Sequence, residues 1–180
     1  ADIEQSVTIP VNRTVYISFQ WDEPFFSVSG STGSASDIDI YLLAGNTVVA
    51  SSIEDNLLTG DPLELLIFTN DGSYDTSTFS LIITRFSGQA PERMQYVPFG
   101  QGFFIDEFKT DSATCYGHAN AQGAAAVGAA NYLLTPEFGV SPPVLESFSS
   151  SGGIPILFDT AGRRLPDPDL RKKPLIVAPD

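Results

Sequence analysis

Cysteine and histidine are almost absent from this sequence, which has 180 residues with one cysteine, Cys115, and one histidine, His118. A single cysteine excludes an intrachain disulfide, a CxxC pair and a zinc cluster built from several cysteines. A single histidine excludes any site that needs two or more imidazoles from the same chain. The sequence therefore does not belong to the disulfide-stapled, CxxC redox or multi-cysteine zinc classes.

Positive charge and long apolar runs are scarce as well. Nine Lys and Arg residues oppose 22 Asp and Glu residues, which gives a net charge of −13. Nucleic acids and anionic membranes repel a protein of this charge, so we expect neither as a partner. No apolar run approaches the roughly 20 residues that a membrane-spanning helix needs.

Alternation of apolar and polar residues dominates the first hundred positions. Apolar residues make up 42% of the chain, which is enough for a packed core. A period of two residues is the signature of a half-buried strand. It predicts strands over residues 7–11, 13–21, 38–42, 47–51, 63–69, 79–86 and 94–99. Several short strands with turn signals between them are typical of a β-sandwich or jelly roll.

Two of the connections are short enough to predict hairpins. Asn12-Arg13 separates the first two strands, and Ala44–Asn46 separates the strands over 38–42 and 47–51. The stretch over 27–36 is rich in glycine and serine, and we expect a loop there.

The composition changes near residue 100. Residues 117–132 are mainly small, which favours a closely packed strand or a tight strand–helix junction. Residues 154–158 and the turn at 160–162 predict a further hairpin, in which Pro155 would force an edge position. Residues 163–173 are polar and contain two prolines, so we expect an exposed connection there. The apolar strand at 175–177 lies three residues before the last residue, Asp180, and we expect this second part to be an incomplete domain.

Three segments of the second part carry motifs in a fixed order. They are residues 117–130, which end in AVGAA, residues 145–152, LESFSSSG, and residues 173–180, KPLIVAPD. In order and spacing they resemble the subtilisin-like serine peptidases, apart from an extra stretch at 154–171. Leu175 stands where that family usually has Asp, and Asp180 where it usually has Gly.

The first hundred residues resemble the bacterial pre-peptidase C-terminal domain. Residues 19–24, 37–42, 47–51, 63–68 and 79–83 carry this second resemblance. Together the two resemblances imply a mainly β chain. A jelly-roll or β-sandwich domain over 1–100 would be followed by an incomplete α/β subtilisin-like segment over 101–180.

The resemblance also implies a function for the whole protein. Subtilisin-like catalysis needs an Asp–His–Ser triad and an oxyanion-hole Asn, and the motifs that carry them are missing here. The chain would then be a non-catalytic segment of a secreted bacterial serine endopeptidase, and the sandwich would help substrate access, binding or folding. Its expected partners are the rest of the peptidase domain and a protein or polysaccharide substrate. Exposed strand edges would also permit self-association.

A few residues are candidates for binding or catalysis. Asp22, Asp37 and Asp39, with Glu23 and Asp61 nearby, could hold calcium through their carboxylates. In the alternative interpretation Asp37 and Asp39 form an exposed acidic face, because the intervening apolar residues fill the core. No other cofactor is expected.

The lone thiol and imidazole are expected to be structural. A catalytic Cys–His pair is remote in sequence in known cysteine proteases, whereas Cys115 and His118 are three residues apart.

Aromatic residues offer a different kind of site. Trp21, Phe25, Phe26 and Tyr41 could form a platform for a sugar or a peptide, although Trp21 continues the alternation of core positions. A stand-alone, secreted carbohydrate- or protein-binding sandwich, with or without a stabilising calcium ion, is therefore the rival function.

Overall fold

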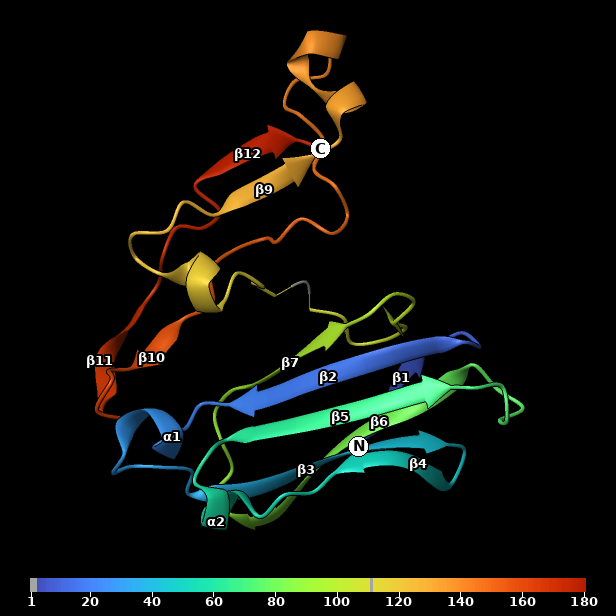
Figure 1. Ribbon diagram of the computed structural model, residues 1–180, viewed down its shortest axis with the longest axis vertical. Coiled ribbons are helices and arrows are strands. Elements are labelled where there is room, and N and C mark those ends of the chain that lie inside the picture. Colours follow the sequence, from blue (N-terminus) through green and yellow to red (C-terminus); the bar gives the residue numbers. More distant parts are fainter. Residues whose placement is uncertain (1–2, 111) are drawn as a thin grey trace. The chain divides into compact units, whose positions relative to one another are not determined.

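The computed structural model describes residues 3–110 and 112–180 and is mainly β, as the alternation predicts. The chain divides into two compact units (Figure 1). The first contains the residues up to Lys109 together with Phe158–Arg164, and the second contains Thr110–Leu157 and Leu165–Asp180. The first unit thus runs past the expected boundary at residue 100 and takes up a short segment from far along the chain. None of the described helices is long and apolar enough to cross a bilayer.

Two antiparallel sheets form the first unit. The five-stranded sheet has the order β4-β3-β6-β1-β8, and the three-stranded sheet has the order β5-β2-β7 (Figure 1). The strands are β1 Gln5–Thr8, β2 Arg13–Trp21, β3 Ser36–Ala44, β4 Thr47–Ser52, β5 Leu63–Asn70, β6 Thr78–Gly88, β7 Met94–Phe99 and β8 Phe104–Ile105.

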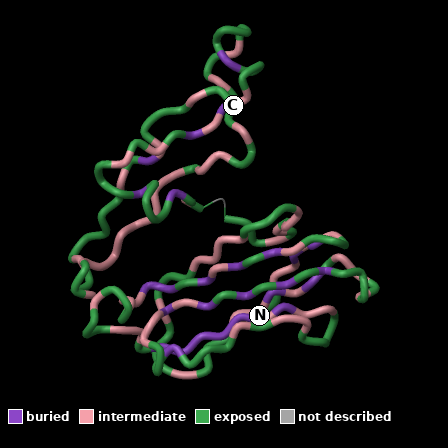
Figure 2. The backbone as a smooth tube through the Cα atoms, in the orientation of Figure 1, coloured by how far each residue is buried: buried purple, intermediate pink, exposed green. Residues whose placement is uncertain are grey.

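Alternate residues of these strands build one apolar core between the sheets. The buried positions concentrate on the central strands (Figure 2). The core residues are Val7, Ile9, Val15, Ile17, Phe19, Trp21, Ile38, Ile40, Leu42, Leu66, Phe68, Phe79 and Leu81. A period of two residues therefore identifies the inward positions, and the prediction that Trp21 belongs to the core is confirmed.

One predicted hairpin is confirmed and the other is wrong. β3 and β4 pair antiparallel through a turn in which Gly45 has a φ of 57°. β1 instead pairs with β6 and β8, while β2 pairs with β5 and β7. The link through Asn12, with a φ of 63°, crosses from one sheet to the other. The crossing places the apolar side chains of β1 and β2 in the shared core from opposite sides.

Two single-turn helices lie in the loops of the sandwich. The expected loop over 27–36 begins with α1, Phe26–Ser29, which ends at Gly30 with a φ of 68°. The second, α2, Asn56–Thr59, connects β4 to β5 and is capped by Asp55, whose Oδ1 accepts from the Leu58 amide at 3.0 Å.

The second unit contains a parallel strand pair and short helical turns. β9, Val127–Ala130, pairs with β12, Ile176–Pro179. The 3-10 turns are η1 Gly117–Asn120, η2 Tyr132–Leu134 and η3 Pro136–Phe138.

The hairpin expected around the turn at 160–162 is present, and its second strand lies in the stretch that we expected to be an exposed connection. β10, Ile156–Phe158, and β11, Arg164–Asp169, form a two-stranded sheet of their own. β11 tolerates Pro166 and Pro168 because each strand of a two-stranded sheet has one unpaired edge. The stretch over 163–173 is largely exposed in its first half, as expected, but there it forms a paired strand instead of a plain connection.

Candidate functional site

The three motif segments of the second part lie together in the structure. β9 and β12 pair in parallel register, from Val127 opposite Ile176 to Ala130 opposite Pro179. Just before the pair, the Leu175 amide donates to the Ala126 carbonyl at 2.9 Å. Parallel pairing needs a long connection between the two strands, and here 45 residues separate Ala130 from Ile176.

The middle segment joins the same pair through β9. The Glu146 amide donates to the Ala129 carbonyl at 3.0 Å, and the Ser149 hydroxyl accepts from the Ala129 amide at 3.1 Å. A Cβ atom at Gly128 would lie 3.1 Å from both Ser149 Oγ and Pro174 Cγ. The crowding at Gly128 explains why a residue without a side chain stands in this strand.

Lys173 fixes the start of the third segment. Its side chain is buried, and its Nζ donates to the carbonyl of Ala124 ahead of β9. The ammonium group therefore satisfies a backbone carbonyl, and it has a structural role at this point.

A hollow of about 570 Å³ lies beside β9. Cys115, His118 and Ser149 line it, together with the exposed rings of Tyr116 and Phe148. Cys115 itself is buried and His118 is exposed. Among the described residues no hydrogen bond joins the imidazole to the thiol or to the Ser149 hydroxyl, which instead accepts from the backbone. The hollow therefore brings nucleophilic atoms near an imidazole without the hydrogen bond that would activate one of them.

Asp22, the first calcium candidate, is held by nitrogen donors. Its Oδ1 accepts from the amides of Glu92 and Arg93 at 3.0 and 3.1 Å, and its Oδ2 accepts from Arg164 Nη2 at 2.7 Å. Burial alone would raise the pKa of Asp22, but the hydrogen bonds from Arg164 and the Arg93 amide outweigh it and lower the pKa. The carboxylate is therefore ionised and already neutralised by Arg164.

Asp37 and Asp39 share a face of β3, as expected from their spacing. Both are buried, at 6% and 7% exposure, so the expectation of an exposed acidic face is wrong. Asp37 Oδ1 accepts from the Asn56 amide at 3.4 Å, and Asp39 Oδ2 accepts from the Tyr41 hydroxyl at 2.8 Å. The packing of α2 and the Tyr41 side chain around them removes them from water. Burial raises the pKa of Asp37, and repulsion from Asp39 adds to the rise.

Metal binding by these carboxylates stays a prediction. Across residues 3–110 and 112–180, no three carboxylate, thiol or imidazole side chains gather in a way that could hold a metal ion.

A buried polar cluster at the corner between β3, β4 and β5 was missed from the sequence. Glu64 lies on the inner face of β5 with 1% exposure, in phase with Leu66 and Phe68. Its Oε1 accepts from Asn56 Nδ2 at 3.0 Å, and its Oε2 accepts from the Ser52 hydroxyl. Burial raises the pKa of Glu64 despite these two donors.

Asn56 closes the same corner with its amide group and is fully buried. Its Oδ1 accepts from the Ile38 amide at 3.2 Å, and its Nδ2 donates to the carbonyls of Asp61 and Leu63 at 3.2 Å each. The charge at Glu64 in the inward phase of an apolar strand was the one available sequence signal. A buried charge needs partners, and Asn56 and Ser52 supply them.

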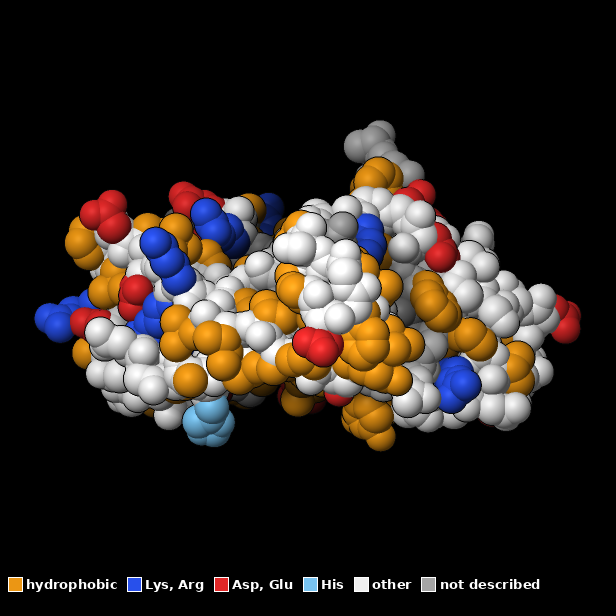
Figure 3. All heavy atoms as spheres, turned by 90° about the horizontal axis from the view of Figure 1, so that it is seen from above, with side chains coloured by type: hydrophobic (Ala, Val, Ile, Leu, Met, Phe, Trp, Pro, Cys, Tyr) orange, Lys and Arg blue, Asp and Glu red, His pale blue; other side chains and the backbone are white. Residues whose placement is uncertain are grey.

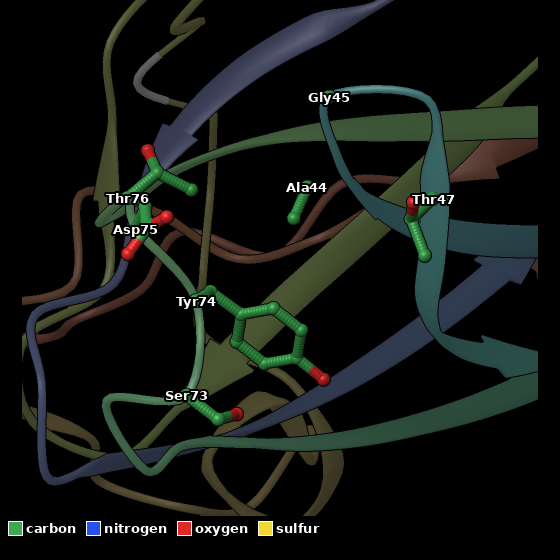
Figure 4. A pocket seen from close by; sticks show the side chains of 7 residues that line it. All are labelled: Ala44, Gly45, Thr47, Ser73, Tyr74, Asp75 and Thr76. Atoms are coloured by element: carbon green, nitrogen blue, oxygen red, sulfur yellow. The ribbon is translucent and has the colours of Figure 1, made fainter.

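A second hollow, of about 380 Å³, lies at one end of the sandwich (Figure 4). Its walls are the turn after β3 and the loop after β5, with Tyr74 between them. The Tyr74 ring packs on Phe68 and Phe79 at centroid distances of 5.9 and 6.1 Å. The remaining lining offers hydroxyl groups and the Asp75 carboxylate. This hollow is open, and its polar groups do not converge on one point.

The proposed aromatic platform is not assembled. Trp21 is 5% exposed and the Tyr41 hydroxyl is bound to Asp39, while Phe26 is 48% exposed on its own helical turn. Of the two neighbouring phenylalanines, Phe25 is half-buried and only Phe26 is exposed.

No family model matches the chain, and no curated protein or solved structure is significantly similar to it.

Proposed function

We propose that this chain is a non-catalytic segment of a larger, secreted subtilisin-like serine endopeptidase, in which the sandwich is an inserted accessory module. The observation that carries the proposal is the meeting of the three motif segments. β9 and β12 pair in parallel, and the segment at 145–152 bonds to the same strand through Ser149 and Glu146. Segments of a shared domain are expected to lie together, whereas chance likenesses scattered along a chain are not.

The apolar surface of the second unit supports the same proposal. Side chains of the strand pair remain exposed, at 55% for Val127, 58% for Ile176 and 44% for Val177. Figure 3 shows hydrophobic side chains broadly exposed on the face that it presents. Soluble domains cover such strand pairs with helices or further strands. The pair is therefore suited to the interior of a larger α/β domain.

The test has two parts. The first is the coding sequence on both sides of this segment, where we expect Asp and His motifs upstream and a GTSxAxP-type serine downstream. The second is labelling of the whole gene product by a fluorophosphonate probe, with the variant that replaces that serine by alanine as control. A stop codon directly after Asp180, a missing triad member or labelling that survives the alanine variant would refute the peptidase proposal.

A second candidate function, a binding module, is favoured by the outward face of the β5-β2-β7 sheet. Tyr16 lies opposite Ile67 on one side and Phe99 on the other, and these three side chains are 51%, 59% and 42% exposed. The outward positions of the three strands carry no charged side chain. They are Thr14, Tyr16, Ser18, Gln20, Leu63, Leu65, Ile67, Thr69, Gln95, Val97 and Phe99.

An uncharged face on a chain with a net charge of −13 fits an uncharged partner. Affinity electrophoresis in gels that contain hydroxyethylcellulose or gelatin tests this candidate. We expect retardation that Tyr16→Ala abolishes and that Tyr132→Ala, an exposed tyrosine of the second unit, leaves intact. Equal mobility with and without both polymers would remove the binding module.

A further inference from the structure

A short segment of the C-terminal part belongs to the sandwich unit. Residues Phe158–Arg164 group with the residues up to Lys109, whereas the residues before and after them group with the second unit. The chain therefore passes between the two units three times, after Lys109, after Leu157 and after Arg164. A module that begins at the first residue of this chain and is joined to the rest only at its own C-terminal end would need a single passage.

The segment is held to the end of β2 by Arg164. Its guanidinium group donates to the Asp22 carboxylate at 2.7 Å and to the Asp22 carbonyl at 2.6 Å. The Asp22 side chain is only 2% exposed, while that of Arg164 is 49% exposed. The Arg164 guanidinium also lies over the Phe158 ring, 4.9 Å from its centroid. A charge-assisted contact to a buried carboxylate is among the stronger polar interactions in proteins.

Close packing supports the same attachment. Gly162 has a φ of 73°, and a Cβ atom there would lie 3.0 Å from Ser29 Cβ and 3.1 Å from Thr32 Cβ. The backbone of the segment thus approaches the loop that follows α1 closely, and only glycine permits both the conformation and the contact.

The tip of the segment is ordered by its own contacts. Asp159 Oδ1 accepts from the amides of Ala161 and Arg163 at 2.9 and 3.0 Å. The Asp159 carboxylate also pairs with the exposed Arg163 side chain at 2.8 Å. The turn is therefore preformed, and Arg164 is the residue that connects it to the sandwich.

We propose that Phe158–Arg164 is a strap that is anchored at the Asp22 end of the sandwich, so that the module is fully folded only when the segment that carries the strap is folded. Without the strap, a buried carboxylate would lose its only cationic partner among the described residues, which is costly. The strap itself does not depend on the proposed function. That the strap couples the folding of an inserted module to that of a peptidase domain rests on the proposed function. Among the roles proposed for the module, this coupling favours a role in folding.

The first test compares Arg164→Ala with Arg163→Ala in the whole 180-residue chain. The two arginines are neighbours, but only Arg164 reaches Asp22, so Arg163→Ala is the matched control. By hydrogen exchange we expect the amides of Glu92 and Arg93, which donate to the Asp22 carboxylate, to exchange at least about tenfold faster in Arg164→Ala alone. Unchanged exchange in Arg164→Ala, or an equal acceleration in Arg163→Ala, would overturn the strap.

The second test measures the coupling through Trp21, which lies next to Asp22. We expect Arg164→Ala to lower the Tm reported by Trp21 fluorescence by about 5–10 °C. Gly128→Val crowds β9 in the second unit and should lower the same Tm in the wild-type background, but not in the Arg164→Ala background.

Strictly additive Tm losses would overturn the coupling. Gly162→Val, which blocks the close approach without touching the ion pair, should accelerate exchange as Arg164→Ala does, and a failure to do so would also count against the strap. Because these measurements need no peptidase activity, their failure is distinct from a negative result with the fluorophosphonate probe.

Discussion

Asn56 offers the sharpest test of how the sandwich closes at its polar corner. Its buried amide group joins three elements, because Oδ1 accepts from the Ile38 amide in β3 and Nδ2 donates to Glu64 in β5. The same Nδ2 donates to the carbonyl of Asp61, in the link between α2 and β5, and to that of Leu63, the first residue of β5. Asn56→Ala removes all four contacts.

The expected loss follows from the groups that remain without a donor or acceptor. The Ile38 amide and the Glu64 carboxylate are both about 1% exposed, so water cannot replace Asn56 without opening the corner. An unsatisfied buried polar group costs about 1–3 kcal/mol, which is the loss that we expect from the Ile38 amide. Glu64 adds a smaller loss, because its Oε1 loses the Asn56 donor while its Oε2 keeps the Ser52 hydroxyl. A domain of this size is typically stable by about 5–15 kcal/mol. Asn56→Ala should therefore remove a substantial part of the stability of the sandwich.

Urea unfolding followed by Trp21 fluorescence is the suitable assay, because the single tryptophan lies in the core of the sandwich. Asn46→Ala, in the exposed turn between β3 and β4, is the matched control and should change the free energy of unfolding by less than about 0.5 kcal/mol. The isosteric Asn56→Asp keeps the volume but turns an oxygen toward Glu64 and two carbonyls. It should destabilise more at pH 7 than at pH 4. An Asn56→Ala loss no larger than that of Asn46→Ala would refute the role of the corner.

Three further predictions concern a buried acid, a metal and a glycine. Burial raises the pKa of Glu64 in the folded state above its ordinary value of 4.5. Protonated Glu64 therefore contributes to the stability of the fold; this contribution is complete below pH 4.5 and is lost as the pH rises through the raised pKa. Glu64→Gln should therefore raise the free energy of unfolding at pH 7 relative to wild type, and a pH-independent difference would contradict this. Since the Asp22 carboxylate accepts from Arg164, we expect EDTA and calcium to leave the Tm unchanged, and a drop of several degrees with EDTA would restore the predicted calcium site. In urea unfolding, Gly88→Ala should lower the free energy of unfolding by at least about 1 kcal/mol more than Gly45→Ala does. Both glycines have a positive φ, but only a Cβ atom at Gly88 would clash with backbone, at 2.2 Å from the Ala35 carbonyl oxygen. Equal losses in the two variants would contradict the clash.

The sequence could predict the strands of the sandwich better than their partners. Alternation depends on which side of a strand is buried, and this property is local, so the inward positions from Val7 to Leu81 were found. Pairing depends on contacts between distant segments. Asn12 adopts a left-handed conformation and carries the chain from one sheet to the other. The pair Asn12-Arg13 would suit a hairpin turn equally well, so the sequence does not distinguish the two paths.

The burial of polar residues is the second property of the fold that the sequence could not predict. Asp37 and Asp39 lie on the outward face of β3, where alternation predicts exposure, but the residues after β4 fold back as α2 and cover Asp37. Glu64 shows the opposite case, since its phase alone places it inside. The phase of a strand decides which face a residue takes, whereas the fraction of that face left in water depends on loops whose paths alternation does not describe.

At the Asp22 end of the sandwich, neither the long-range pairing nor the burial of the carboxylate could be predicted from the sequence. The strap could therefore not be predicted either. Asp22 follows a strand that ends in the core at Trp21, and its carboxylate would be read as a free ligand in a loop. Its actual partner is Arg164, 142 positions later, beyond a second unit. An acidic chain with nine basic residues offers few such partners, so each buried carboxylate without one must be stabilised by amides and hydroxyls or be protonated. Asp22 has a cation and a lowered pKa, whereas Glu64 has only neutral donors and a raised one. Ionisation of Asp22 stabilises the fold, so its contact with Arg164 is lost in acid. Ionisation of Glu64 destabilises the fold, so the corner around Glu64 is weakened as the pH rises.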